Sequence, residues 1–151
     1  MDISDKSLVL LILFMLFSIP VSVFDIRSMR IPNWIVFSGT VFLFAVRYFY
    51  FKDSPVGMLI NMLSGGLMFY TIRFITKGKL GMGDVKFAAL IALFTGFPLF
   101  FAAVAFSSIT GLIFALAGLS VGRINKTTKI PFVPFLTAGS IIACLIKNIF
   151  L

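Results

Sequence analysis

The chain has 151 residues and a formal net charge of +8; 60% of its residues are hydrophobic and only 12% are charged. Soluble domains are about 45–50% apolar and about 25% charged, so this composition excludes a soluble globular protein and a disordered chain. The chain has no His and one Cys. That excludes Ser-His and Cys-His catalytic pairs, a cysteine-cluster metal site and an intrachain disulfide, and we expect neither a metal nor another cofactor.

Apolar runs long enough for membrane helices, about 20 residues each, follow one another along the chain. They cover residues 8–24, 34–51, 56–75, 85–122 and 131–150. As one helix, the 38 residues of the fourth run would extend about 57 Å, almost twice the hydrocarbon core, so we expect a turn at Gly96-Phe97-Pro98. The sequence therefore predicts an all-α, polytopic membrane protein with six transmembrane helices in a single domain, residues 1–151.

The basic residues predict the orientation of these helices. Four Lys and Arg residues lie on the side of the termini, and nine lie in or beside the loops after the first, third and fifth helices. The nine are Arg27, Arg30, Arg73, Lys77, Lys79, Lys86, Arg123, Lys126 and Lys129. The positive-inside rule makes this side cytoplasmic and puts both termini outside. The asymmetry explains the net charge, so nucleic acid is not needed as a partner.

The first run is expected to remain as a helix. Asp2, Asp5 and Lys6 precede it instead of a basic region, and no small-residue cleavage site follows it. These features argue against a cleavable signal peptide.

Two of the five acidic residues, all Asp, stand apart from the others. Asp25 follows the first apolar run and Asp84 opens the fourth, so both are expected at the cytoplasmic edge of the membrane. Ionisable groups at this depth are costly and indicate a functional site. Structural roles are equally open: Asp25 could pair with Arg27 or Arg30, and Asp84 could cap its helix.

Two neighbouring carboxylates share a proton, so that one can activate water while the other donates to a carbonyl oxygen. An aspartyl intramembrane protease is therefore the hydrolase class that this sequence still supports. A small transporter or channel is an alternative, although acids within helices and an inverted repeat would be more typical of one. A catalytically inactive assembly protein is the other alternative.

Residues 81–86 form a G-x-G-D-x-K pattern around Asp84. Gly81 and Gly83 lack a Cβ, which lets a second backbone approach closely. A phosphate-binding loop does not fit, because no strand precedes the pattern and a third glycine is missing. Lys86 either extends to the membrane interface or tunes the neighbouring acid.

Three blocks of the chain resemble the type 4 prepilin peptidases, a family of G-x-G-D aspartyl membrane proteases. The blocks are D-I-R-S-M-R-I-P-N at 25–33, G-M-G-D-V-K at 81–86 and P-F-V-P-F-L at 131–136, with Val133 where the family usually has Gly. The resemblance implies that Asp25 and Asp84 are the catalytic pair. It also implies a supporting loop region that contains Gly81, Gly83, Lys86, Pro32 and Asn33.

This resemblance implies removal of the short basic leader of prepilins or pseudopilins, on the cytoplasmic side of the cell membrane and just ahead of the pilin's hydrophobic helix. The partners would be these substrates and the lipid bilayer. The chain is similar to the short, peptidase-only members, since it lacks the paired C-x-x-C motifs of the methyltransferase region. We therefore expect the mature pilin to leave this chain unmethylated.

Overall fold

The computed structural model describes residues 3–122 and 130–150. These residues form six helices and, within the described ranges, no strand, which confirms the predicted all-α class. The helices are α1 (Ile3–Ser28), α2 (Asn33–Phe49), α3 (Pro55–Ile75), α4 (Met82–Thr95), α5 (Phe97–Ser120) and α6 (Val133–Phe150). Arg123, Lys126 and Lys129, which the sequence analysis assigned to a basic loop, lie outside the described residues.

The long apolar run folds back where the sequence predicts. Gly96 separates α4 from α5 with a φ of +78°, a left-handed conformation that glycine adopts without steric cost. Pro98 follows in the first turn of α5, where its missing N–H has no helical partner to lose. Asn61 of α3 supports this turn, because its side-chain oxygen accepts a hydrogen bond from the Phe97 N–H at 3.2 Å.

Within the part of the chain that the structure describes, three helices contain segments long and apolar enough to cross a membrane: Leu8–Ser28, Pro55–Ile75 and Phe97–Ser120. By contrast, the 14 residues of α4 extend only about 21 Å, less than the hydrocarbon core. Most of its side chains after the first turn are covered by protein, with Phe87, Leu90 and Ile91 fully buried. The apolar sequence of α4 therefore forms the centre of the core. The structure thus contains the six predicted helices, whereas the prediction that all six cross the membrane stays a prediction.

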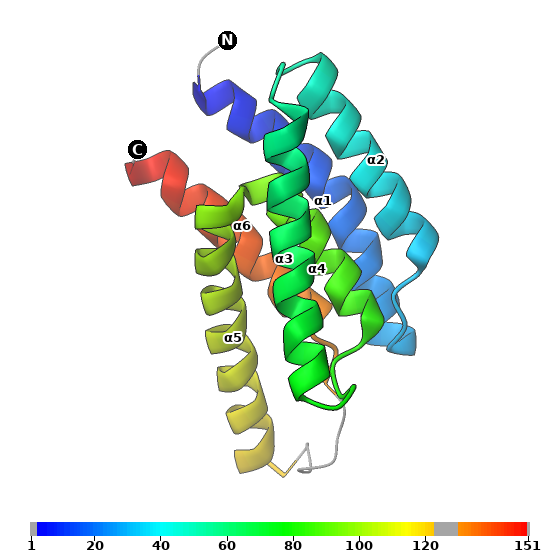
Figure 1. Cartoon of the computed structure of the whole chain (residues 1–151). Helices are drawn as coiled ribbons and strands as arrows, with labels where there is room; N and C mark the ends of the chain where they lie inside the picture. The colour runs from blue at the N-terminus through cyan, green and yellow to red at the C-terminus, as the bar shows by residue number, and fades with distance from the viewer. Residues whose placement is uncertain (1–2, 123–129, 151) are drawn as a thin grey trace.

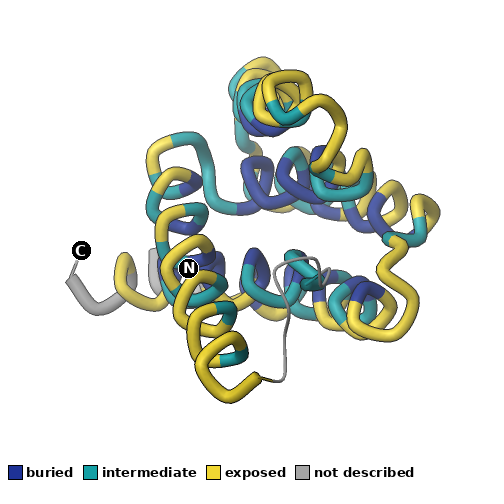
Figure 2. Tube along the Cα trace, turned by 90° about the horizontal axis from the view of Figure 1, so that it is seen from below, coloured by how far each residue is buried: buried dark blue, intermediate teal, exposed yellow. Residues whose placement is uncertain are grey.

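The helices are arranged around α4, and the helix ends that carry the predicted site residues lie at one end of the molecule (Figure 1). The last turn of α1, the start of α2, the end of α3, the start of α4 and the start of α6 meet there, and we call this the loop end. The first turn of α1 and the last turn of α6 lie at the opposite end. Buried residues face the interior and exposed ones the outside (Figure 2).

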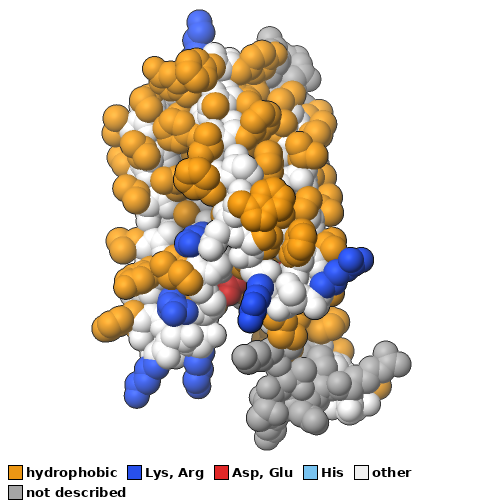
Figure 3. Space-filling model, turned by 90° about the vertical axis from the view of Figure 1, so that its right-hand side faces the viewer, with side chains coloured by type: hydrophobic (Ala, Val, Ile, Leu, Met, Phe, Trp, Pro, Cys, Tyr) orange, Lys and Arg blue, Asp and Glu red, His pale blue; other side chains and the backbone are white. Residues whose placement is uncertain are grey.

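On the face shown in Figure 3, an apolar belt covers most of the upper and middle part, while Lys and Arg side chains gather towards the loop end. Acidic surface appears between them on the face shown. Such a belt fits a lipid environment, because large apolar side chains including Phe37, Leu63 and Ile113 are exposed. The structure is thus that of a helical membrane protein.

The opposite end is closed by an ion-pair cluster. Asp53, in the α2–α3 connection, contacts Lys6 of α1 and Arg47 of α2, both at 2.7 Å. Burial pushes the pKa of Asp53 upwards, but hydrogen bonds from Lys6 and Arg47 outweigh it and hold the pKa below its usual range. Asp53 therefore acts as a structural anion that ties α1 to the α2–α3 hairpin.

Candidate active site

Asp25 lies in the last turn of α1 and is only 6% exposed. The predicted helix ended one residue before Asp25, but α1 continues until Met29 adopts a φ of +50° and donates its N–H to the Asp25 carbonyl at 2.8 Å. The Asp25 carboxylate accepts a hydrogen bond from the Val133 N–H at 3.1 Å. Its partner is thus the free backbone N–H at the start of α6 rather than Arg27 or Arg30.

Asp84 occupies the first turn of α4 and is half-buried. Gly81 is the N-cap residue, and the Asp84 carboxylate reaches back to accept its N–H at 3.1 Å. A carboxylate at this position is favoured by the positive end of the helix dipole. Asp84 therefore does help to cap its helix, as considered above, but it does so from the third helical position and not as the N-cap residue.

The two glycines of the G-x-G-D pattern make room for two different groups. A Cβ on Gly81 would lie 2.9 Å from the Asp84 carboxylate oxygen. A Cβ on Gly83 would lie 2.7 Å from the Cβ of Ile31, in the α1–α2 connection. The first glycine therefore lets Asp84 fold back on the helix end, and the second lets the segment after Asp25 pack directly against α4.

A hydrogen bond joins the same two segments. The Lys86 ammonium donates to the side-chain oxygen of Asn33 at 3.0 Å, across 53 residues of sequence. Pro32 is the N-cap of α2, and its carbonyl accepts the Ile35 N–H at 3.1 Å. Lys86 thus links the start of α4 to the start of α2.

A cavity of about 380 Å³ opens at this junction. It contains every site residue expected from the sequence except Pro32, which lies beside it as the α2 cap. The lining residues are Asp25, Met29, Arg30, Ile31, Asn33, Gly81, Met82, Gly83, Asp84 and Lys86. Two segments that are far apart in sequence, 25–33 and 81–86, therefore form one polar cavity at the loop end, which we call the aspartate cavity.

The electrostatics of this cavity couple the two carboxyl groups. Asp84 sits at the loop end, in a helix that is not one of the three candidate spans. Burial and, second, the negative charge of Asp25 raise its pKa to about 6, against a smaller lowering effect of the Gly81 N–H. Asp84 therefore retains its proton at a pH where an ordinary Asp is ionised.

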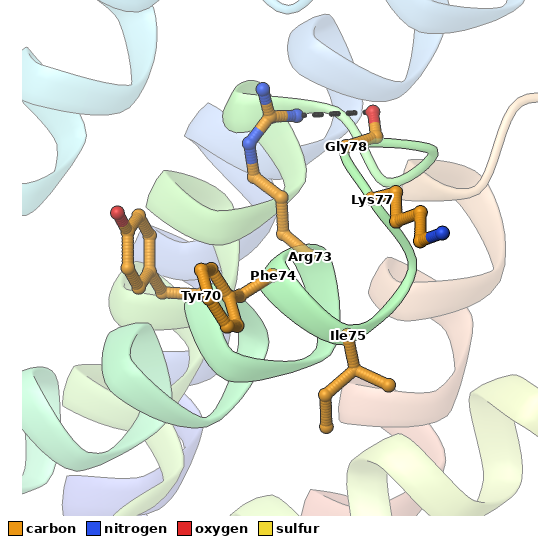
Figure 4. Close-up of a pocket in the computed structure, with 6 residues that line it drawn as sticks. All are labelled: Tyr70, Arg73, Phe74, Ile75, Lys77 and Gly78. Carbon is orange, nitrogen blue, oxygen red and sulfur yellow. Dashed lines mark hydrogen bonds between the residues drawn. The ribbon is translucent and has the colours of Figure 1, made fainter.

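A larger cavity, about 630 Å³, lies beside the end of α3 and has Tyr70, Phe74 and Lys77 in its lining (Figure 4). Arg73 points across it to the carbonyl of Gly78 at 3.4 Å and also donates to the carbonyl of Leu80. Its lining contains no acidic residue. Its part in the site is indirect, since Arg73 braces the loop that leads into Gly81.

Two contributors to the site were missed by sequence reasoning. The Val133 N–H holds Asp25, although the 131–136 block had only been matched as a pattern. Ile31 forms the surface against which Gly83 packs. Every residue except Pro has a backbone N–H, so residue type could not predict the hydrogen bond from Val133. The Pro and Phe residues of 131–136 did single out that segment as a recognisable pattern.

Chemically, this cavity offers two carboxyl groups, of which Asp84 has a pKa raised to about 6 and stays protonated below that pH. A Lys side chain lies beside them. Within residues 3–122 and 130–150, no cluster of three His, Cys, Asp or Glu side chains suited to a metal ion occurs. A pair of carboxyl groups in different protonation states fits general acid–base chemistry.

The fold and the cavity define a class: a helical membrane protein with a paired-carboxylate site at one end. Comparison with known proteins identifies the family, because the model of the type IV leader peptidase family matches residues 11–116, and the chain belongs to this family. It is 37% identical over 134 residues to the prepilin leader peptidase/N-methyltransferase of Bacillus subtilis (strain 168). That match covers 89% of this chain and 54% of the relative, so the chain spans about half the relative's length. No solved structure matches the chain.

Proposed function

We propose that this protein is a membrane-embedded aspartyl endopeptidase, which removes the N-terminal leader from prepilins or pseudopilins at the cytoplasmic face of the cell membrane. The observation that carries the proposal is that Asp25 of α1 and Asp84 of α4 line one cavity. Membership of the type IV leader peptidase family and the name of the Bacillus relative support a prepilin-type substrate. The concentration of basic residues at the same end supports the cytoplasmic face.

In the proposed reaction, the ionised carboxylate takes a proton from a water molecule, whose oxygen attacks the scissile carbonyl carbon. The protonated carboxyl donates its proton to the carbonyl oxygen. When the tetrahedral intermediate collapses, the C–N bond breaks and the proton taken from water passes to the leaving amine. At the same time the donor carboxylate takes its proton back from a hydroxyl group of the intermediate, so that the new carboxyl group forms and both aspartates return to their starting states. Asp84 is the better donor, because its raised pKa keeps it neutral up to about pH 6, and Asp25 is then the base.

The direct test is co-expression with a candidate prepilin, followed by electrophoresis and sequencing of the product's N-terminus. We expect a mobility shift of leader size and a new N-terminus at the start of the hydrophobic segment. An uncut prepilin beside a properly inserted enzyme, repeated with prepilins from several pilus and secretion systems, would contradict the proposal.

The assignment of the pair predicts that Asp25→Asn and Asp84→Asn each lower the cleavage rate at least about 1000-fold, and that the double variant is hardly worse than either single one. Residues that act as one unit show this strong non-additivity. Rates would be measured on purified enzyme with one prepilin. Asp53→Asn is the matched control, because Asp53 belongs to the ion-pair cluster at the opposite end and should leave cleavage intact. Substantial cleavage in either single variant would rule out the pair.

A further inference from the structure

The aspartate cavity continues into an apolar groove along α2. A neighbouring cavity of about 550 Å³ shares Asn33 and Lys86 with it. A third cavity of about 500 Å³ shares Phe37, Thr40 and Met62 with the second and extends to Phe49. Together these two cavities form what we call the α2 groove. It follows α2 from Asn33 to Phe49, about 24 Å at helical rise.

The walls of the α2 groove are made of apolar side chains. Phe37 is 71% exposed and Phe49 is 75% exposed. Ala89 of α4 and Met62 of α3 also line the groove. Apart from Asn33 and Lys86, its polar side-chain groups are the indole N–H of Trp34, the hydroxyl of Thr40, which donates to the Val36 carbonyl, and the hydroxyl of Tyr48. The groove therefore offers almost nothing with which an extended backbone could form hydrogen bonds.

This chemistry determines what the groove can accept. In an apolar environment, a polypeptide must satisfy its own backbone hydrogen bonds, so an occupying chain has to be an apolar α-helix. The aspartate cavity differs, since Arg30, Asn33 and Lys86 line it together with two carboxyl groups. An unwound peptide finds hydrogen-bond partners there. The Lys86–Asn33 hydrogen bond lies at the boundary between the two environments.

We infer that the α2 groove binds the apolar segment of the substrate as a helix, and that this helix unwinds at the Lys86–Asn33 pair to present its scissile bond to Asp25 and Asp84. The inference rests on the proposed function and adds the binding site that selects the substrate. Continuity supports it: a peptide held in the aspartate cavity must leave along a neighbouring surface. The α2 groove shares two lining residues with that cavity, whereas the larger cavity beside α3 shares none.

The first experiment fills the groove. Thr40→Trp places a large side chain where the two groove cavities meet, and Ser38→Trp is the matched control. Both positions are on α2 and each hydroxyl bonds a carbonyl of the same helix, but Ser38 lies outside the groove lining. Two substrates are compared: one with its whole apolar segment, and a peptide cut a few residues after the scissile bond.

We expect Thr40→Trp to lower the ratio of kcat/KM for the long substrate to that for the short peptide by about tenfold or more, equivalent to about 1.4 kcal/mol of lost binding. Ser38→Trp should leave this ratio unchanged. An unchanged ratio in Thr40→Trp would overturn the inference and identify the groove as a lipid-covered surface.

The second experiment does not depend on cleavage. In the Asp84→Asn background, a photoreactive benzoylphenylalanine replaces either Phe37, in the groove, or Phe42, on another face of α2 against Phe17. We expect cross-links between position 37 and the apolar segment of the long substrate, and few from position 42. Equal labelling from both positions, or labelling of lipid alone, contradicts the inference. If the unmodified enzyme cuts neither substrate, the proposed function fails, while cross-linking still decides whether the groove binds an apolar helix.

Discussion

At the scale of single residues, the raised pKa of Asp84 is the property that matters most for the proposed acid–base chemistry. Its side chain is half-buried, and the other ionisable groups that line the cavity are Asp25 from α1, Arg30 from the α1–α2 connection and Lys86 from α4. Burial is the largest influence on the Asp84 pKa and the charge of Asp25 is the second, and both favour the neutral acid. The two carboxyl groups therefore titrate as a coupled pair.

From this coupling we predict a decline of cleavage at high pH. Asp84 holds its proton up to about pH 6, and ionisation above this value removes the proton that the mechanism must donate. The rate should fall about tenfold per pH unit once the pH exceeds the upper apparent pKa of the pair. A pH profile of kcat/KM measures this limb, and a rate that stays constant up to pH 10 would contradict the assignment.

A titration of Asp84 itself gives a second measurement of the same coupling. In Asp25→Asn the charge contribution disappears while burial remains, so the pKa of Asp84 should move down from about 6 without reaching that of an exposed Asp. Infrared difference spectroscopy of the carboxyl stretch follows this titration. Asp53→Asn, at the opposite end, should leave the pKa of Asp84 unchanged.

At the scale of elements, the site depends on how closely the α1–α2 connection approaches the start of α4. The approach is made at Gly83, against which Ile31 packs without space for a Cβ. Asp25 lies in the last turn of α1 and Ile31 follows it by six residues in the α1–α2 connection, so we expect a displacement of Ile31 to change the separation of the two aspartates.

We predict that Gly83→Ala lowers kcat/KM by about tenfold, since forcing an extra methyl group into a packed contact costs about 1–3 kcal/mol. Ile31→Ala removes two of the three Ile31 atoms that the new Cβ would meet, so the double variant should recover part of the activity. Steady-state kinetics on one prepilin measures both. Gly57→Ala in α3 is the control, because its Cβ would meet only Ser54, at 3.9 Å. If the double variant were worse than Gly83→Ala alone, this steric explanation would be wrong.

For the whole molecule, the clustering of connections at the loop end makes the orientation in the membrane testable. Ser28 and Lys77 are exposed at that end, and Lys52 is exposed in the α2–α3 connection at the other. Cysteine substitutions at these positions would be made in a Cys144→Ser background, since Cys144 is the only cysteine of the chain.

We predict that an impermeant thiol reagent added to intact cells labels Lys52→Cys but not Ser28→Cys or Lys77→Cys. The reason is the excess of Lys and Arg at the loop end, which retains that end in the cytoplasm. Labelling after cell lysis confirms that the inner positions are reactive. Labelling of Ser28→Cys from outside would reverse the orientation and contradict cleavage at the cytoplasmic face.

Much of this arrangement was readable in the linear pattern. Runs of apolar residues identify helices because a backbone in an apolar environment must bond to itself. The length of the fourth run predicts that it folds back, and Gly96 and Pro98 mark the place of the turn. The three blocks at 25–33, 81–86 and 131–136 were recognised as short patterns. Asp25, Asp84 and their glycines were likewise singled out by residue type and by their position at the ends of apolar runs.

Tertiary structure decided what those patterns could not. Apolar composition says that a helix avoids water but not whether lipid or protein surrounds it, so only the packing of α4 among its neighbours showed that it forms the core. The hydrogen bond from the Val133 N–H to Asp25 spans 108 residues, and the Lys86–Asn33 bond spans 53. Such contacts depend on how whole helices meet. The sequence by itself therefore determined which residues gather at one end of the molecule, and the packing of α1, α4 and α6 decided which atoms contact one another there.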